Sequence, residues 1–171
     1  RQVRMAFEEL TRITGKEPEC SASPGWRCTE ELLRSKESFP FRYNSDCRGN
    51  SIFLPVVDGK TLTVPQIPLN LPTYDELYGR DGITNENYNS RLLDRFSPDG
   101  LNLLTIHAEV EGRICADLFD RFLTEAKARG IEFCAPGDLL PEDRTALPRG
   151  RMIQGEIPGR EGVLALQGSL T

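Results

Sequence analysis

The feature that most limits the possible folds is an alternation of apolar, strand-length runs with an amphipathic helix. Residues 101–108, "LNLLTIHA", form such a run, and residues 131–136, "IEFCAP", form another. The intervening segment 116–130 has apolar residues at helical spacing and ends at Gly130. Strands that alternate with helices are typical of a parallel sheet. We therefore predict an α/β fold with about four parallel strands, enough for half of an eight-stranded barrel but too few to close one.

Other local patterns fit between these elements. Apolar spacing predicts a first helix over Val3–Ile13 that stops at Gly15, and Thr29 is placed to cap a second helix. Asp58-Gly59 predicts the turn of a hairpin. The tail from Pro148 is rich in glycine and is expected to be irregular. The remaining expected elements are a strand over 42–46 and helices over 73–78 and 86–96.

Length and composition exclude several classes of protein. A chain of 171 residues is the size of one domain, 1–171, and has no apolar run of the ~20 residues that cross a bilayer. A net charge of −5 argues against a nucleic-acid partner. The 5 cysteines have no paired short spacing, which argues against a cysteine metal site and for a reducing compartment. Because the chain opens on Arg1 inside a helix pattern, we expect a piece of a longer protein.

Two polar clusters follow predicted strands, where parallel α/β folds place their functional groups. One is Asp46 with Arg48, and the other is His107 with Glu109 and Glu111. As the last inward residue of its strand, His107 is placed to transfer a proton, although a lone histidine is more often structural. Asp46 is either a surface turn residue or a carboxylate that orients the imidazole.

Each of three further side chains has two possible roles. Arg27 and Arg48 either bind an anion or are simply solvated. Trp26, the single tryptophan, either stacks on a sugar ring or packs in the core.

Several of these stretches together resemble a known family. "CSASPGWR", "RYNSDCRG", "VPQIPLNLPTYDELYGRD", "LLTIHAEVEG" and "RGRMIQGEIPGREG" occur in this order, and the resemblance covers residues 1–162. The chain is similar in these motifs to the 4-deoxy-4-formamido-L-arabinose-phosphoundecaprenol deformylases, a branch of the NodB-type polysaccharide deacetylase superfamily. The resemblance implies part of a distorted (β/α) barrel and one divalent metal ion. The metal motifs, Asp-x-Asp and a pair of histidines, lie upstream in that family, and neither occurs here. The resemblance is therefore to a C-terminal part, without metal ligands.

The resemblance also implies roles for particular residues. His107 matches the histidine that gives a proton to the leaving amine, and Asp46 matches the acidic residue that orients it. The arginine of the superfamily's Arg-x-Pro motif is replaced in Ala22-Ser23-Pro24, and Arg27 is the candidate to take its place. From charge and location alone, Glu109 and Glu111 are expected to meet the emerging ammonium and Arg48 the substrate phosphate.

The implied activity is hydrolysis of the formamide on an undecaprenyl-phosphate-linked 4-formamido sugar, a step of lipid A modification and polymyxin resistance. The implied partners are that substrate, the missing N-terminal half of the barrel and the cytoplasmic face of the bacterial inner membrane, which the enzyme would contact peripherally. Two alternatives remain open. One is a non-catalytic or truncated barrel module that only binds a glycolipid or a partner chain. The other is a deacetylase of polysaccharide N-acetyl groups, against which "NSDCRG" and "HAEVEG" weigh.

Overall fold

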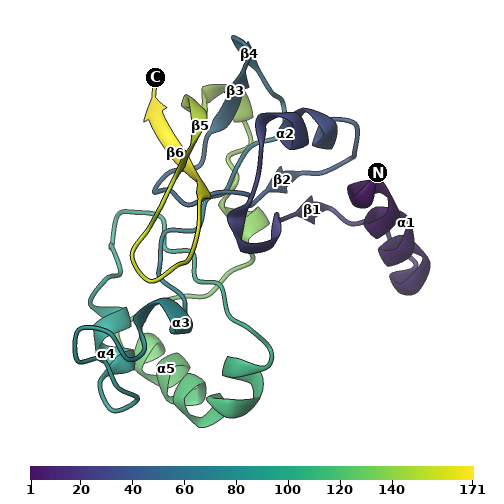
Figure 1. Cartoon of the computed structure of the whole chain (residues 1–171). Helices are drawn as coiled ribbons and strands as arrows, with labels where there is room; N and C mark the ends of the chain where they lie inside the picture. The colour runs from purple at the N-terminus through teal and green to yellow at the C-terminus, as the bar shows by residue number, and fades with distance from the viewer. The chain divides into compact units, whose positions relative to one another are not determined.

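The computed structural model describes residues 1–171 and has a mixed α/β architecture (Figure 1). Its residues group into two compact units, described separately below. Unit 1 comprises residues 1–68, 140–155 and 163–171, and unit 2 comprises residues 69–139 and 156–162. The prediction of a single domain over 1–171 stays a prediction.

Unit 1 contains both sheets. A parallel pair joins β1 (Cys20–Ser21) to β2 (Tyr43–Asn44), and a four-stranded sheet has the order β4-β3-β5-β6. In that sheet β3 is parallel to β5, whereas the other neighbours are antiparallel. The bounds are β3 (Leu54–Val57), β4 (Lys60–Thr61), β5 (Arg149–Gly155) and β6 (Leu164–Leu170).

Several local predictions for unit 1 are confirmed. Helix α1 (Gln2–Thr14) ends at Gly15 in the left-handed conformation, with φ 71°. The hydroxyl oxygen of Thr29 accepts a hydrogen bond from the Leu32 N–H and so caps α2 (Glu30–Lys36). The β3–β4 hairpin turns at Asp58 and Gly59, both with positive φ, as a tight two-residue hairpin requires.

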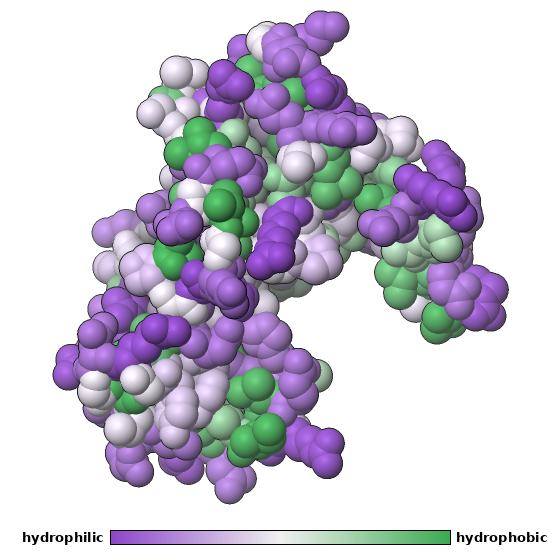
Figure 2. Space-filling view, in the orientation of Figure 1, coloured by the Kyte–Doolittle hydropathy of each residue, from purple (hydrophilic) through white to green (hydrophobic).

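Helix α1 presents apolar side chains at the surface of unit 1. Phe7 packs against Phe39 and Phe41, with ring centroids 5.3 and 5.9 Å apart. Met5, Leu10 and Ile13 are nevertheless 57%, 48% and 63% exposed. The apolar surface over this helix is visible in Figure 2. None of the helices is both long and apolar enough to cross a membrane.

Unit 2 is built on short helices around one apolar cluster. Its helices are α3 (Tyr74–Leu77), α4 (Tyr88–Leu93) and α5 (Ala116–Ala128), with a π-helical turn over Val110–Ile114. The helix predicted over 116–130 is confirmed as α5, and its apolar residues form one inner face: Leu118, Phe122 and Ala126 are buried, while Phe119 and Leu123 pack against them partly exposed. This cluster also includes Leu71, Leu77, Ile83, Tyr88, Leu92, Leu93 and Cys115.

Three sequence predictions are wrong in the structure. Residues 101–107 and 131–135 belong to no strand or helix, and Phe133 is 51% exposed. An extended apolar segment becomes a strand only where a neighbour completes its hydrogen bonds. The tail, expected to be irregular, instead forms the antiparallel strands β5 and β6. The parallel sheet of about four strands is therefore not observed, and no closed barrel is present.

Candidate functional site

The segment after β2 is held in place by backbone pairing with β6. The Arg48 N–H donates to the Ala165 carbonyl at 2.9 Å, and the Gln167 N–H donates to the Arg48 carbonyl at 2.7 Å. This close approach explains Gly49, because a Cβ there would lie 2.5 Å from the Cβ of Gln167. The strand end that carries Asp46 is thus fixed against β6.

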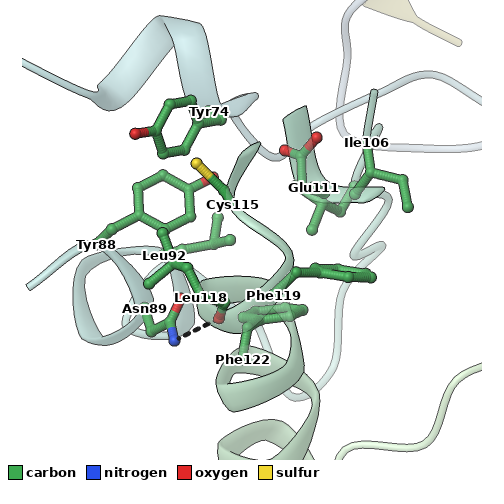
Figure 3. Close-up of a pocket in the computed structure, with 11 residues that line it drawn as sticks. Tyr74, Tyr88, Asn89, Leu92, Ile106, Glu111, Cys115, Leu118, Phe119 and Phe122 are labelled. Atoms are coloured by element: carbon green, nitrogen blue, oxygen red, sulfur yellow. Dashed lines mark hydrogen bonds between the residues drawn. The ribbon is translucent and has the colours of Figure 1, made fainter. Parts of the chain in front are cut away.

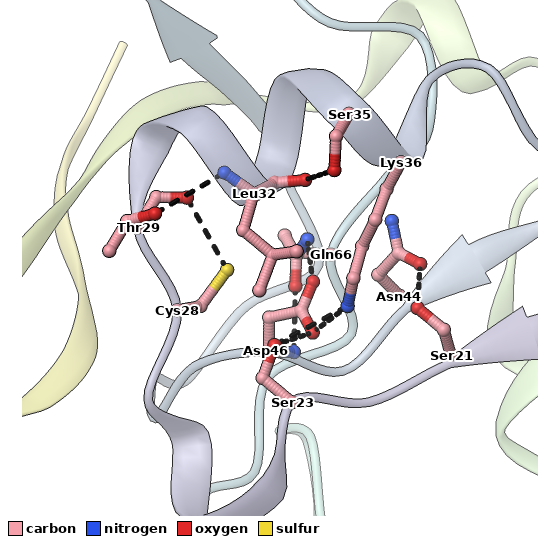
Figure 4. Close-up of polar contacts among 10 residues, drawn as sticks. All are labelled: Ser21, Ser23, Cys28, Thr29, Leu32, Ser35, Lys36, Asn44, Asp46 and Gln66. Atoms are coloured by element: carbon pink, nitrogen blue, oxygen red, sulfur yellow. Dashed lines mark hydrogen bonds and ion pairs between the residues drawn. The ribbon is translucent and has the colours of Figure 1, made fainter. Parts of the chain in front are cut away.

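Asp46 is completely buried, with 0% of its surface exposed, and its carboxylate has three hydrogen-bond donors (Figure 4). Oδ1 accepts from the Ser23 hydroxyl at 2.8 Å and from the Lys36 ammonium at 2.5 Å. Oδ2 accepts from the Gln66 amide at 3.1 Å, and the Asp46 N–H donates to the Gln66 side-chain oxygen at 2.9 Å. The interpretation of Asp46 as a surface turn residue is therefore wrong. Sequence reasoning missed Lys36 and Gln66 as its partners.

Trp26 and Arg48 form one stacked pair. The Arg48 guanidinium lies 5.0 Å from the centroid of the Trp26 ring, a cation–π distance. Trp26 itself is only 7% exposed, which fits core packing better than an open sugar platform. Its φ of 56° lies in the left-handed region, where a bulky side chain is strained. Arg27, the next residue, is exposed.

Two thiols share this buried environment. Burial, and then the negative charge of Asp46, raise the pKa of the Cys28 thiol to about 11. Burial raises the pKa of Cys47 further still, with added contributions from Asp46 and Cys28. Thiols whose thiolate form is this disfavoured are poor nucleophiles and poor metal ligands.

His107 lies in unit 2, three residues before the π-helical turn Val110–Ile114. The Glu111 carboxylate accepts a hydrogen bond from the His107 backbone N–H at 2.7 Å, and the His107 carbonyl accepts from the Val110 and Glu111 N–H groups. Glu111 is buried, with 6% of its surface exposed, whereas His107 is half-buried and Glu109 is exposed. This hydrogen bond fixes the backbone that carries the imidazole. The π-helical turn that follows is of a kind that often occurs at functional sites.

A second charged group in unit 2 joins α3 to the tail segment 156–162. Arg160 donates to Asp75 at 2.8 Å and lies 3.4 Å from Glu76. Burial raises the pKa of Asp75, but the Thr73 hydroxyl, Arg160 and, more weakly, His107 lower it, and the net pKa lies below its usual value. Gly159 permits the contact, because a Cβ there would lie 2.7 Å from the Glu76 carbonyl oxygen.

Two cavities lie in unit 2. One, of about 10 Å³, has room for a single water and is lined by aromatic and aliphatic side chains together with Glu111 (Figure 3). Burial raises the pKa of Tyr88 in its wall, and the Glu111 charge adds to this effect. The other cavity, of about 680 Å³, lies among residues 93–104, 122 and 129–139, and none of the predicted site residues lines it.

The predicted site residues thus fall into two groups. Asp46, Arg48, Trp26 and Arg27 belong to unit 1, and His107, Glu109 and Glu111 belong to unit 2. The pairing of Asp46 with His107 stays a prediction. No group of three or more His, Cys, Asp or Glu side chains that could hold a metal ion occurs among residues 1–171. The residues of this chain do not fit a metal site.

No protein-family model matches the chain. It is 47% identical over 169 residues to a protein of Shewanella sediminis (strain HAW-EB3) described as probable 4-deoxy-4-formamido-L-arabinose-phosphoundecaprenol deformylase ArnD. It is 38% identical over 170 residues to a protein of the same description from Wigglesworthia glossinidia brevipalpis. The alignments cover 99% and 98% of this chain but only 54% and 59% of these relatives. The chain is therefore homologous to a part of such proteins and spans about half of their length, which confirms the resemblance stated from the motifs.

Proposed function

We propose that this chain, as a homologue of the ArnD deformylases over almost its whole length, forms part of an enzyme that hydrolyses the formamide of an undecaprenyl-phosphate-linked 4-formamido-L-arabinose. The products are formate and the 4-amino sugar. The observation that carries the proposal is the 47% identity over 169 residues, which includes the segments of both Asp46 and His107. The new amine would let the sugar neutralise lipid A, the basis of polymyxin resistance.

His107 would give a proton to the nitrogen that leaves as the amine. Its half-buried position and the Glu111 carboxylate on its backbone N–H support this role, because a general acid must be held in one place at the reacting bond. Asp46 would orient that histidine, as the resemblance implies. Its complete burial and three donors support a positioning role over direct contact with substrate.

The remaining predicted residues would meet the substrate. Glu109 is exposed and carries the negative charge expected to receive the emerging ammonium, whereas Glu111 already holds the His107 backbone. Arg48 would meet the substrate phosphate while it stacks on Trp26, and Arg27 is exposed beside that pair. Replacement of Arg48 or Glu109 should raise KM more than it lowers kcat.

In the complete protein we propose that the chain forms part of a distorted (β/α) barrel of the polysaccharide deacetylase type, completed by an N-terminal half. A divalent metal ion would then be held by ligands outside this chain, where it would activate water and polarise the formyl carbonyl. The enzyme would work at the cytoplasmic face of the inner membrane, where a lipid-linked substrate is found.

The test is release of formate from the lipid-linked formamido sugar by the full-length protein, compared with its His107→Gln variant. We expect kcat to fall by about 10²- to 10⁴-fold in the variant, the range for loss of a general acid, with KM nearly unchanged. An exposed charge in the middle of α5 supplies the control, Arg121→Gln, which should keep full activity. No formate from the wild type would refute the function, and an active His107→Gln variant would refute the role of His107.

A further inference from the structure

Four polar side chains meet in the interior of unit 1. They are Ser23, Lys36, Asp46 and Gln66, with exposed fractions of 5%, 2%, 0% and 0%. They come from four separate segments: the turn before Trp26, the last residue of α2, the end of β2 and the extended stretch before unit 2. A fully hydrogen-bonded polar network of this kind specifies one arrangement of the segments that it joins.

Lys36 is the unexpected member. From the last turn of a helix, a lysine side chain ordinarily extends into water, where its ammonium is hydrated. Figure 4 shows the Lys36 side chain extending from α2 to the Asp46 carboxylate instead. Its Nζ lies 2.5 Å from Asp46 Oδ1 and 3.4 Å from the Ser23 hydroxyl. A buried ammonium carries a large desolvation cost, and replacing such a pair by apolar side chains is often neutral for stability. Stability alone therefore does not explain the lysine.

The network joins two segments of the predicted site. Ser23 precedes the turn Pro24–Trp26, in which Gly25 and Trp26 both have positive φ. Asp46 precedes Arg48, whose guanidinium covers the Trp26 ring. A strained tryptophan backbone persists only where its surroundings over-determine it, and such strain concentrates at functional sites. The Ser23–Asp46 hydrogen bond and the Arg48–Trp26 stack supply two such constraints.

We propose that Lys36 is a positioning residue of this site. Its positive charge holds the Asp46 carboxylate and the Ser23 hydroxyl. Through them it fixes the position of the turn that carries Trp26 and Arg27 relative to Arg48. This inference rests on the proposed function, because Asp46, Arg27 and Arg48 are residues of the proposed site. The charge of Lys36, and not only its volume, is then required for turnover.

The experiment compares Lys36→Met, Lys36→Arg and the control Lys60→Met in the full-length protein. Methionine has a similar volume without charge, arginine keeps the charge, and Lys60 is exposed in β4. Formate release is measured at a temperature where circular dichroism shows each variant folded. We expect kcat to fall at least tenfold in Lys36→Met with a smaller change in KM, because the ammonium holds the Asp46 carboxylate, to which the proposed function gives the positioning of the general acid. Lys36→Arg should retain part of the activity, and Lys60→Met all of it.

A second readout does not depend on activity. The protein is labelled with 5-fluorotryptophan, and the ¹⁹F resonance of Trp26 is identified by its loss in Trp26→Phe. We expect this resonance to shift or broaden in Lys36→Met and to be unchanged in Lys60→Met. If the wild type releases no formate, the proposed function fails, and the ¹⁹F result alone decides whether Lys36 positions the turn.

Ser23→Ala keeps the experiment decisive if Lys36→Met does not fold. It removes one hydroxyl that links the pair to the turn, with little change in volume. The proposal expects the Trp26 resonance to change and kcat to fall in this variant also. The proposal would be overturned if folded Lys36→Met had a wild-type kcat and an unchanged Trp26 resonance. If Lys36→Met does not fold, the same result for Ser23→Ala would overturn it.

Discussion

From the sequence alone, the side chain of Lys36 would be predicted to be exposed to solvent. It stands in "EELLRSKESF", where charged residues surround it and nothing marks it as different from Arg34 or Glu31. In the structure its ammonium is buried against Asp46 at 2.5 Å. For Asp46, in contrast, the sequence predicts a position at the end of a strand, and the residue follows β2 in the structure. Its partner depends on how α2 packs, and no local pattern encodes that packing.

The cysteines allow a direct test of side-chain burial. Cys20 and Cys134 are exposed, whereas Cys28, Cys47 and Cys115 are buried. Because the thiolate is the reactive form, the rise of the Cys28 pKa from 9.0 to about 11 lowers its reactive fraction about a hundredfold near neutral pH.

We therefore expect a chromogenic disulfide reagent at pH 7.5 to modify Cys20 and Cys134 rapidly in the native chain, and the other three thiols only after unfolding in urea. The double variant Cys20→Ser/Cys134→Ser should lose the fast phase and keep the slow one. Rapid modification of Cys28 in native protein would show that this part of unit 1 is open to solvent.

The helices and the hairpin follow their local signals closely, and the extended segments do not. Gly15 ends α1, Thr29 caps α2, and Asp58-Gly59 turns β3 into β4, all as predicted. A cap or a tight turn is satisfied within a few residues, so its sequence signal is sufficient. A strand needs a continuous ladder with a neighbour from elsewhere in the chain, and residues 101–107 and 131–135 belong to no such ladder.

The link between α3 and the tail should appear in the pH dependence of stability. The folded-state pKa of Asp75 lies below its ordinary value of 3.8, so its contribution is present above about pH 4. It is lost as the pH falls through the lower, folded-state pKa. Since the Asp75 side chain is 51% exposed, we expect only the ~0.2–1 kcal/mol of a solvent-screened pair.

Urea unfolding between pH 3 and 6 measures this contribution. In Arg160→Met the decrease of the unfolding free energy toward acid should be smaller than in the wild type, because the charge that favours ionised Asp75 is gone. Arg121→Met, which removes an exposed charge from α5, should retain the wild-type dependence. Parallel curves for Arg160→Met and wild type would contradict the assignment.

At the level of the complete chain, apolar groups remain at the surface in both units. Met5, Leu10 and Ile13 of α1 are about half exposed or more, and so are Ile106 and Phe133 beside the extended segments of unit 2. Exposed apolar side chains of this kind favour association between chains.

We expect these 171 residues, expressed alone, to self-associate at micromolar concentration, as measured by light scattering coupled to size exclusion. Ile106→Gln/Phe133→Gln should lower the average mass by removing apolar surface from unit 2, and Leu10→Gln/Ile13→Gln tests the contribution of α1 separately. A monomer with one cooperative melting transition in dilute solution would show that the chain satisfies its own surfaces.

By itself, the sequence determined the elements whose signals are local, the absence of a membrane-length helix, and, through its motifs, the resemblance that the homologues confirm. It also predicted that Asp46 follows a strand, as it does after β2, whereas the strand predicted before His107 is absent. The tertiary structure alone decided that the tail pairs as β5 and β6, that Lys36 turns inward to Asp46, and that Glu111 bonds to the His107 backbone. The distances between the residues in these contacts follow from packing, burial and strand pairing. The free energy of such contacts depends on neighbours that no short stretch of sequence contains.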